Sequence, residues 1–427
     1  MKRHLIGIGG VGMSALATAL VRLGDEVTGA DRTLGTPNIK FLESLGVKVY
    51  PDDGSGVDKS TDEVIVSTAI EETNAGLVKA KALGIPVTHR AKALSRTLKD
   101  YKLVAVVGTC GKSTVTAMLG HVLAECGLDP MCVNGANVPG WEGAVRFGKG
   151  EYAVAEVDES DKSLVAFKPY AAIVTNASAD HYSKEEMDEV FDAFIKDCQG
   201  PVIDGRGHLE SIESLETLEV PVPGQHNRQN AEMAVRMAVA LGVSSDRAIA
   251  AMKTFRGVER RLQRHGANVY DDYAHNPEKL KAMWTTLAEK HPEGICVIWR
   301  PHGYAPLRKM MDALAAMFVE TIRSKDKLLL LPVYDAGGTT DRSVNSDALV
   351  AKIESLGSSG PIGFLGPSGS TSSTSTLTLS DTKVTLVPDL DAAYAWCAAH
   401  KGDYAAFVTC GARDPGLPLL AKRLSEM

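Results

Sequence analysis

Residues 103–125 read LVAVVGTCGKSTVTAMLGHVLAE, which predicts a strand, a glycine-rich turn and a helix in direct succession. The apolar run Leu103–Val107 is typical of a strand buried on both faces of a parallel sheet. The turn then presents backbone amides, a lysine and hydroxyl groups at the start of a helix, where an anion is favoured. This combination predicts a phosphate-binding loop inside an α/β domain.

The residue types of this loop suit the triphosphate of ATP. Lys112 can reach the β- and γ-phosphates, and the hydroxyl of Ser113 or Thr114 can meet Mg²⁺. The spacing is shorter than the full GxxxxGK[ST] pattern, because position 106 is Val. The residues of the loop expected to bind ATP are Gly108, Thr109, Cys110, Gly111, Lys112, Ser113 and Thr114.

Two segments farther along the chain place metal-ligand chemistry after predicted strands. Four carboxylates stand between Glu156 and Asp161, after the predicted strand 152–156. Because hard oxygen ligands beside a triphosphate suit Mg²⁺, Glu156 at the strand end is the best candidate ligand. The next predicted strand, 171–175, is followed by Asp180-His181, in the region where a doubly wound sheet binds its ligands.

A second glycine-rich turn lies near the N-terminus. The sequence Gly7-Ile-Gly9-Gly10-Val-Gly12 fits GxGxxG between a predicted strand and a helix, and Asp31 follows the second strand. Taken alone, this motif indicates a nicotinamide-dependent dehydrogenase. Any dinucleotide or nucleotide diphosphate relies on the same turn and helix N-terminus, so the ligand class stays open at this point.

Strand-like and helix-like segments alternate in three successive series, which predicts an α/β fold of three domains. The length of 427 residues fits three domains of roughly 150 residues each, and we place them at residues 1–100, 101–254 and 255–427. Strands are predicted at 4–8, 26–30, 47–50, 64–67, 85–88, 103–107, 152–156, 171–175, 268–273, 295–299, 327–333 and 405–409. Helices are predicted at 13–23, 39–45, 113–125, 230–241, 246–253, 277–290, 307–318 and 417–425, and further helix-like segments are expected before the strands at 64–67 and 85–88.

Composition excludes several classes of protein. The net charge of −7 argues against a nonspecific nucleic-acid or anionic-membrane binder, so any phosphate must be held by local groups. No apolar run approaches the ~20 residues that span a bilayer, and the N-terminus lacks a secretory signal, so a cytoplasmic protein without membrane insertion is expected. The seven cysteines include no CxxC pair. Residues 357–380, rich in Gly, Ser and Thr, predict an exposed loop or a weak hairpin.

Four more motifs complete the pattern: residues 224–230 (GQHNRQN), Arg260-Arg261, residues 271–277 (DDYAHNP) and residues 300–302 (RPH). In this order, the motifs resemble the Mur ligase family, the ATP-dependent amide-bond-forming enzymes of peptidoglycan assembly, over nearly the whole chain. The resemblance implies an N-terminal Rossmann-like domain for a UDP-sugar, a central P-loop ATPase domain and a C-terminal Rossmann-like domain that closes over the site.

The opening motif, residues 4–14, is most similar to family members that join L-alanine to the carboxylate of UDP-N-acetylmuramate. The resemblance therefore implies small-molecule substrates, ATP and Mg²⁺ as cofactors, an acyl-phosphate intermediate, and a monomer or homodimer. It implies that the UDP-sugar contacts Gly9, Gly10, Val11, Gly12, Met13, Ser14, Asp31, Arg32, Ser67, Thr68 and Ala69. Beyond the phosphate loop, it implies that ATP contacts His226, Asn227, Asn230, Arg261, Asp272 and Asn276. Lys112, Glu156, His181 and His275 would be catalytic, Ser113, Glu156 and His181 would hold Mg²⁺, and His302 would bind the amino acid.

The chain departs from the family pattern at several of these positions. Cys110 stands where the family commonly has His, Ser113 where Thr is usual, and Gly303 where an arginine commonly follows the histidine. A murein-peptide ligase, or another ligase of the family with a different UDP-sugar or amine, therefore stays an alternative. A dehydrogenase leaves residues 108–114 unexplained, and a non-catalytic nucleotide-binding regulator is disfavoured because the lysine, metal and histidine positions are all filled.

Overall fold

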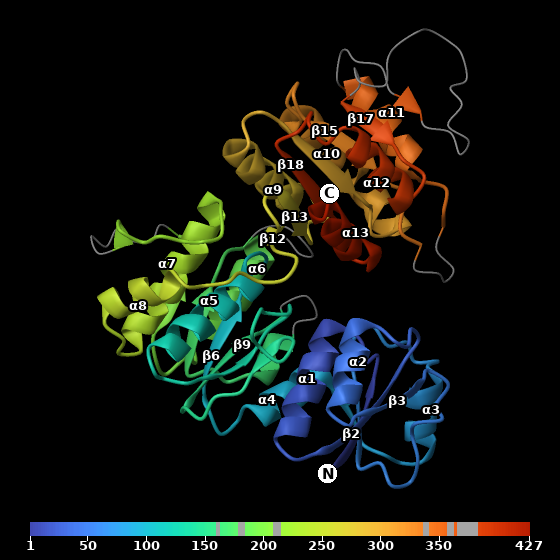
Figure 1. Cartoon of the computed structure of the whole chain (residues 1–427). Helices are drawn as coiled ribbons and strands as arrows, with labels where there is room; N and C mark the ends of the chain where they lie inside the picture. Colours follow the sequence, from blue (N-terminus) through green and yellow to red (C-terminus); the bar gives the residue numbers. More distant parts are fainter. Residues whose placement is uncertain (159–162, 178–183, 208–214, 336–340, 357–362, 365–382) are drawn as a thin grey trace. The chain divides into compact units, whose positions relative to one another are not determined.

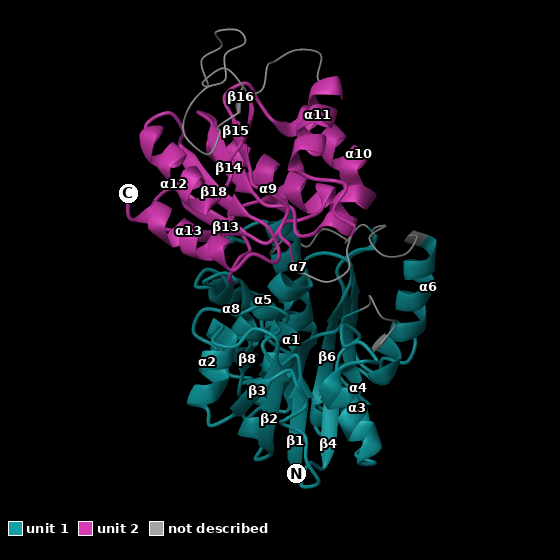
Figure 2. Cartoon of the chain, turned by 90° about the vertical axis from the view of Figure 1, so that its right-hand side faces the viewer, with its two compact units in different colours: residues 1–222, 226–258 teal, residues 223–225, 259–427 magenta. Residues whose placement is uncertain are grey.

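The computed structural model describes residues 1–158, 163–177, 184–207, 215–335, 341–356, 363–364 and 383–427. They form two compact units (Figure 2). Unit 1 comprises residues 1–222 and 226–258, and unit 2 comprises residues 223–225 and 259–427. Unit 1 contains two sheets and unit 2 one, and all three are largely parallel. The expected α/β class is confirmed, whereas the domain boundaries at residues 100 and 254 stay predictions.

The first sheet of unit 1 has five parallel strands in the order β3-β2-β1-β4-β5. Its segments are blue in Figure 1. The strands are β1 (Lys2–Ile6), β2 (Glu26–Asp31), β3 (Lys48–Pro51), β4 (Glu63–Val66) and β5 (Val87–His89). The helices are α1 (Val11–Arg22), α2 (Pro37–Ser44), α3 (Ala75–Ala82) and α4 (Arg90–Thr97).

The prediction of a helix before the strand at 64–67 is wrong. Residues 52–62 form turns instead, in which the Asp53 and Asp58 carboxylates accept hydrogen bonds from the amides of Ser55 and Ser60. Such local bonds from short acidic side chains compete with a helix.

The second sheet of unit 1 has the strand order β11-β10-β6-β9-β7-β8, and only the edge pair β7–β8 is antiparallel. The strands are β6 (Lys102–Val107), β7 (Met131–Val133), β8 (Val145–Arg146), β9 (Tyr152–Glu156), β10 (Ala171–Val174) and β11 (Val202–Asp204). The helices are α5 (Lys112–Glu125), a 3₁₀ turn (Ser163–Ala166), α6 (Lys184–Ile195), α7 (Gln225–Ala240) and α8 (Ser245–Met252).

Strand β6 is buried on both faces, as its apolar sequence predicts. Leu103, Ala105 and Val107 join one core, whereas Val104 and Val106 join the core on the opposite face. Consecutive side chains of a strand point to opposite faces, so only a strand covered on both sides can be apolar at every position. The phosphate-binding loop therefore starts from a rigid central strand.

The sheet of unit 2 has seven strands in the order β12-β13-β18-β14-β15-β17-β16, and only β12 is antiparallel to its neighbour. The strands are β12 (Gln263–His265), β13 (Val269–Asp272), β14 (Ile295–Trp299), β15 (Lys327–Leu330), β16 (Gly363–Phe364), β17 (Val384–Leu386) and β18 (Ala406–Cys410). The helices are α9 (Pro277–Lys290), α10 (Tyr304–Thr321), α11 (Ser346–Leu356), α12 (Leu390–Ala399) and α13 (Gly416–Ser425). Helices α9, α10 and α11 share one core with the sheet, and α12 and α13 share the other.

The predicted elements at 152–156, 277–290 and 295–299 agree with β9, α9 and β14 at both ends. The helix expected at 230–241 instead begins at Gln225, directly after Gly224, whose φ of +105° allows a tight turn. His226 and Asn227 therefore lie on the first turn of α7. Of the exposed loop or weak hairpin expected at 357–380, only 363–364 is among the described residues, and these two residues form β16, which pairs in parallel with β17.

Candidate functional site

The N-terminal glycine turn lies at the carboxyl end of β1, between the ends of β2 and β4. The Asp31 carboxylate accepts a hydrogen bond from the Gly9 amide at 2.8 Å, and a Cβ on Gly9 would stand 2.9 Å from the same carboxylate. The turn that begins at Ser67 also reaches this edge, because the Ile70 side chain is 3.4 Å from the position of a Cβ on Gly7. The structure thus brings together three segments that the sequence assigned to one ligand.

Helix α1 begins at this turn without a side-chain cap on Gly10. The first amides of an α-helix have no partner within the helix, so an uncapped first turn attracts an anion such as a diphosphate. Arg32 lies farther out, paired with Asp52 at 3.3 Å. One residue that was not assigned to the site is Arg90, whose guanidinium stands 3.2 Å from the position of a Cβ on Gly12.

The central loop, residues 108–114, is held by the neighbouring strand β10. The Asn176 side chain hydrogen-bonds to this loop. Its Oδ1 accepts from the Thr109 hydroxyl at 2.6 Å and from the Cys110 amide at 2.9 Å. Its Nδ2 donates to the Cys110 carbonyl at 3.0 Å, and Thr175 donates to the same carbonyl at 2.6 Å. The sequence motifs did not assign Asn176 to the site, although its place directly after the strand beside β6 was a signal for it.

Both glycines of this loop adopt backbone conformations that favour glycine. Gly108 has φ +126° and Gly111 has φ +85°. A Cβ on Gly108 would stand 2.2 Å from the Thr175 hydroxyl, and one on Gly111 would stand 2.7 Å from Asn230 Oδ1. The Lys112 ammonium donates to the Gly108 carbonyl at 2.5 Å, so this side chain curls over the loop that it follows. The loop has the shape that a phosphate cradle needs, with its lysine at the mouth.

Helix α7 contributes three of the predicted ATP residues. Asn227 and Asn230 are both buried, and Asn230 Nδ2 donates to Asn227 Oδ1 at 3.4 Å. Asn230 lies against the phosphate loop, because a Cβ on Gly111 would stand 2.7 Å from its Oδ1. Burial lowers the pKa of His226, so its ring is neutral at pH 7.

Glu156 ends β9 and pairs with Val106 of β6, two residues before the loop. Its Oε2 accepts the Gly135 amide at 2.8 Å, and a Cβ on Gly135 would stand 2.6 Å or less from either carboxylate oxygen. Within the described residues, no group of three or more His, Cys, Asp or Glu side chains could hold a metal alone. The Glu156 carboxylate and the buried Ser113 hydroxyl are groups that suit Mg²⁺ that takes its other ligands from phosphates and water. The remaining predicted ligand, His181, lies outside the described residues, as do Asp180 and Asp161.

In unit 2, the side chains of Asp272 and Asn276 accept hydrogen bonds from backbone amides near the predicted site. Both oxygens of the buried Asp272 carboxylate accept backbone amides at 2.7 Å, from Leu262 and Ala274. Asn276 caps helix α9 by accepting the Lys279 amide at 2.9 Å. Their direct contact with ATP stays a prediction, and in this structure their side chains hold the turn between β13 and α9.

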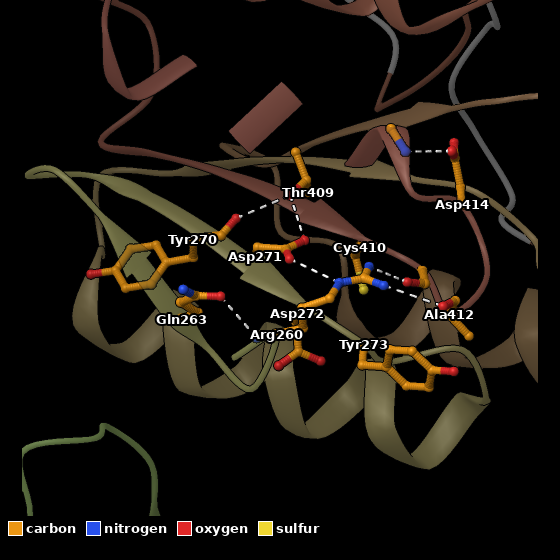
Figure 3. A network of polar contacts seen from close by, with 12 residues as sticks. Arg260, Gln263, Tyr270, Asp271, Asp272, Tyr273, Thr409, Cys410, Ala412 and Asp414 are labelled. Carbon is orange, nitrogen blue, oxygen red and sulfur yellow. Dashed lines mark hydrogen bonds and ion pairs between the residues drawn. The ribbon is translucent and has the colours of Figure 1, made fainter. Parts of the chain in front are cut away.

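Arg260, which the sequence motifs left without a role, is the centre of a polar network (Figure 3). Its guanidinium donates to the fully buried Asp271 carboxylate at 2.9 Å and to the carbonyls of Gly411 and Ala412 at 2.5 and 3.2 Å. Its backbone has φ +57°, a conformation that is uncommon outside glycine and that fits the sharp entry into β12. The guanidinium carbon of Arg261, a predicted ATP ligand, lies 5.2 Å from the centre of the Tyr273 ring, and its contact with ATP stays a prediction.

Two predicted histidines of unit 2 lie together. The rings of His275 and His302 are edge to face, with centroids 4.8 Å apart. Burial lowers the pKa of each from 6.5 to about 4, and nearby cationic side chains add to the effect. Both imidazoles are therefore neutral at pH 7.

A model described as "Mur ligase family, catalytic domain" matches residues 2–102, and one described as "Mur ligase, glutamate ligase domain" matches residues 258–413. The chain is 30% identical over 412 residues to a UDP-N-acetylmuramate–L-alanine ligase of Rhizobium etli, an alignment that covers 83% of this chain and 86% of the relative. It is 32% identical over 400 residues to a ligase of the same name from Gloeobacter violaceus, covering 82% and 85%.

Solved structures agree in fold. A UDP-N-acetylmuramate-alanine ligase from Thermotoga maritima superposes with a TM-score of 0.77 at 24% identity, covering all of this chain and 98% of that one. A murein peptide ligase from Psychrobacter arcticus gives a TM-score of 0.65 at 20% identity, with coverage of 100% and 99%. Of the helices in the described ranges, none has the length and apolar character that crossing a bilayer requires.

Proposed function

The chain belongs to the Mur ligase family, and on that premise we propose that it joins L-alanine, or a similar small amino acid, to the carboxylate of UDP-N-acetylmuramate. The reaction consumes ATP, requires Mg²⁺ and proceeds through an acyl phosphate. The names and the 30% identity of the curated relatives support this substrate pair. The substrates are nucleotides and an amino acid, so we place the reaction in the cytoplasm, as a step of peptidoglycan assembly.

The observation that carries the proposal is the phosphate loop of unit 1, which Asn176 holds by hydrogen bonds, against which Asn230 lies at Gly111, and over which the Lys112 side chain folds. A carboxylate does not react with an amine at neutral pH, so it must first be activated. Transfer of the γ-phosphoryl group from ATP to the carboxylate of the UDP-sugar gives an acyl phosphate and ADP. The positive charge of Lys112 and the amides of the loop stabilise the negative charge on the transferring group.

Mg²⁺ would bind between the phosphates and the chain, where Ser113 and Glu156 are the described ligands that fit it, and it would neutralise part of the phosphate charge. Glu156 is held in place by the Gly135 amide, which leaves its Oε1 without a hydrogen-bond partner among the described residues. The amine of the amino acid then attacks the acyl carbon, and phosphate leaves as the amide forms. His181 stays a predicted second ligand.

The UDP-sugar would bind at the N-terminus of α1. The uncapped first turn there suits the diphosphate, whereas Asp31 holds Gly9 and so fixes the shape of the turn. A nicotinamide-dependent dehydrogenase would use the same turn, yet it gives no role to the phosphate loop of β6 and α5.

Phosphate release tests the proposal. Purified protein with ATP and Mg²⁺ should release phosphate only when UDP-N-acetylmuramate and a small amino acid are both present. Lys112→Ala should lower this rate by about 1,000-fold or more, because a charge that stabilises the transition state is lost. No activity with UDP-N-acetylmuramate and any small amino acid would reject the proposal, and NADH oxidation would favour the dehydrogenase.

One sequence feature favours a second candidate within the family. Gly303 replaces the arginine that commonly follows His302 in this family, so the acceptor amine can differ from L-alanine. The same assay with short murein peptides in place of amino acids separates the two candidates. A murein-peptide ligase would attach a free peptide and ignore alanine.

A further inference from the structure

Three loops of unit 2 begin from one row of residues across the sheet. Asp272 of β13 pairs with Cys410 of β18, and Cys410 pairs with Trp299 of β14. The three strands are adjacent and parallel, so their carboxyl ends meet at one edge. Each loop carries a polar side chain three positions beyond this row: His275 after β13, Arg413 after β18 and His302 after β14. The sheet register therefore brings these three side chains to the same edge.

This edge is the switch point of the sheet. Helices α9 and α10, which follow β13 and β14, pack in one core, whereas α13, which follows β18, packs in the core on the opposite face. Where consecutive connections leave to opposite faces, their loops part and open a crevice at the carboxyl ends of the strands. Ligands of open α/β sheets bind in such crevices.

Two other arginines at this edge, Arg260 and Arg300, are already hydrogen-bonded, and the guanidinium carbon of a third, Arg261, lies 5.2 Å from the centre of the Tyr273 ring. Arg260 donates to Asp271 and to the carbonyls of Gly411 and Ala412. Arg300 donates to Asp414 at 2.5 Å and to the Pro332 carbonyl at 3.1 Å. These bonds fix the loop after β18 on both sides of Arg413.

Arg413 itself is exposed, and no hydrogen bond or ion pair joins its guanidinium to any residue that the structure describes. A guanidinium on a fixed loop binds planar anions with two parallel hydrogen bonds. Arg413 is therefore a cation at this edge that is available to an anionic group.

The two imidazoles beside it offer hydrogen-bond acceptors. His275 Nδ1 lies 3.0 Å from the Tyr273 carbonyl, which can only accept, so Nδ1 carries the proton. Because the ring is neutral, Nε2 has a lone pair and needs a donor. Arg413 and Lys279 also lower the pKa of His302, after the larger effect of burial, which agrees with their closeness to this pair.

A ligand that suits both the Arg413 guanidinium and the His275 Nε2 acceptor has an anionic group and a protonated amine. A phosphate group lacks the amine, and it would leave the His275 acceptor without a donor. We propose that Arg413 binds the carboxylate of the incoming amino acid while His275 Nε2 accepts a hydrogen bond from its ammonium group. Arg413 thus supplies the guanidinium that this chain lacks at Gly303. The inference rests on the proposed function, because it needs an amino acid as substrate.

Steady-state kinetics of the full-length protein test this role. In Arg413→Gln, KM for the amino acid should rise by about 10- to 100-fold, the loss expected for one charge-assisted pair, whereas KM for ATP and for the UDP-sugar stays within about two-fold. Arg413→Lys should recover part of the loss. Arg423→Gln is the matched control, because Arg423 is an arginine of the same unit that pairs with Asp391 on the surface of α13.

An amine without a carboxylate makes the test specific. The wild type should use L-alaninamide at least about 10-fold less efficiently than L-alanine, and Arg413→Gln should lose this preference. A wild type that uses both equally well, a variant that keeps the preference, or a variant in which only KM for ATP rises overturns the role of Arg413 and leaves the proposed function standing. Phosphate release that never depends on an amino acid overturns both.

Discussion

Asn176 holds Cys110 from both sides, since its Oδ1 accepts the Cys110 amide at 2.9 Å and its Nδ2 donates to the Cys110 carbonyl at 3.0 Å. The loop that would bind the phosphates of ATP is thus fixed by a residue of the neighbouring strand end. Cys110 stands where the family commonly has histidine, so its backbone, and not its side chain, is the part that this contact uses.

Asn176→Ala removes these two bonds and a third from Thr109. The loop amides would then lose their fixed directions, and we expect KM for ATP to rise by about 10-fold or more. The melting temperature should change little. The control is Asn345→Ala, which removes a helix cap in unit 2 through the Ala348 amide. A similar KM for ATP in Asn176→Ala and in the control would contradict the role of Asn176.

Gly111→Ala should abolish ATP binding, because the new Cβ would stand 2.7 Å from Asn230 Oδ1 in a loop that cannot shift without losing its shape. Isothermal titration with a nonhydrolysable ATP analogue measures this. Gly127 provides the control, since it has the same φ of +85° but nothing within 4 Å of a Cβ. Gly127→Ala should cost about 1 kcal/mol of stability and leave ATP binding unchanged. Equal affinities in the two variants would show that the contact with Asn230 is unimportant.

Arg260→Met should destabilise unit 2 by about 3 kcal/mol or more, because the Asp271 carboxylate is fully buried and would lose its cationic partner. Urea unfolding followed by tryptophan fluorescence can detect this, because Trp284 and Trp299 lie in the core of this unit. Arg423→Met breaks an exposed pair with Asp391 and a contact with the Tyr394 ring, and it should change the transition little. An unchanged transition in Arg260→Met would show that the network does not stabilise the unit.

His4 predicts a pH dependence of the stability of unit 1. Its ring is buried, with Nδ1 2.9 Å from the Thr28 hydroxyl, and burial lowers its pKa from 6.5 to about 4. The unfolded chain therefore binds a proton at a higher pH than the folded one. The contribution of neutral His4 to the free energy of unfolding is complete above pH 6.5. It is lost as the pH falls from 6.5 to about 4, by about 3 kcal/mol in total.

Urea midpoints at pH 7 and pH 5 check this. His4→Gln cannot take up the proton, so its loss of stability between the two pH values should be smaller than that of the wild type by about 2 kcal/mol. Equal losses in the two proteins would mean that His4 does not titrate abnormally.

Sequence patterns alone predicted the α/β class, the two glycine turns and the strand ends that carry chemistry, because burial on two faces and glycine-dependent turns leave direct marks in the order of residues. The apolar run 103–107 and the helix 277–290 show this well. The turns at 52–62 and the start of α7 at Gln225 were missed, since short polar side chains and a single glycine decided them locally.

Only the tertiary structure decided which polar residues act together. Asn176 and Asn230 reach the phosphate loop from other elements, and Asp272 is occupied by backbone amides although its motif suggested a ligand contact. The pairing of β13, β18 and β14 brings His275, Arg413 and His302 to one edge although up to 138 positions separate them in the chain. Sequence determines what each strand end can offer, whereas strand order and register, which depend on long-range packing, determine which ends meet.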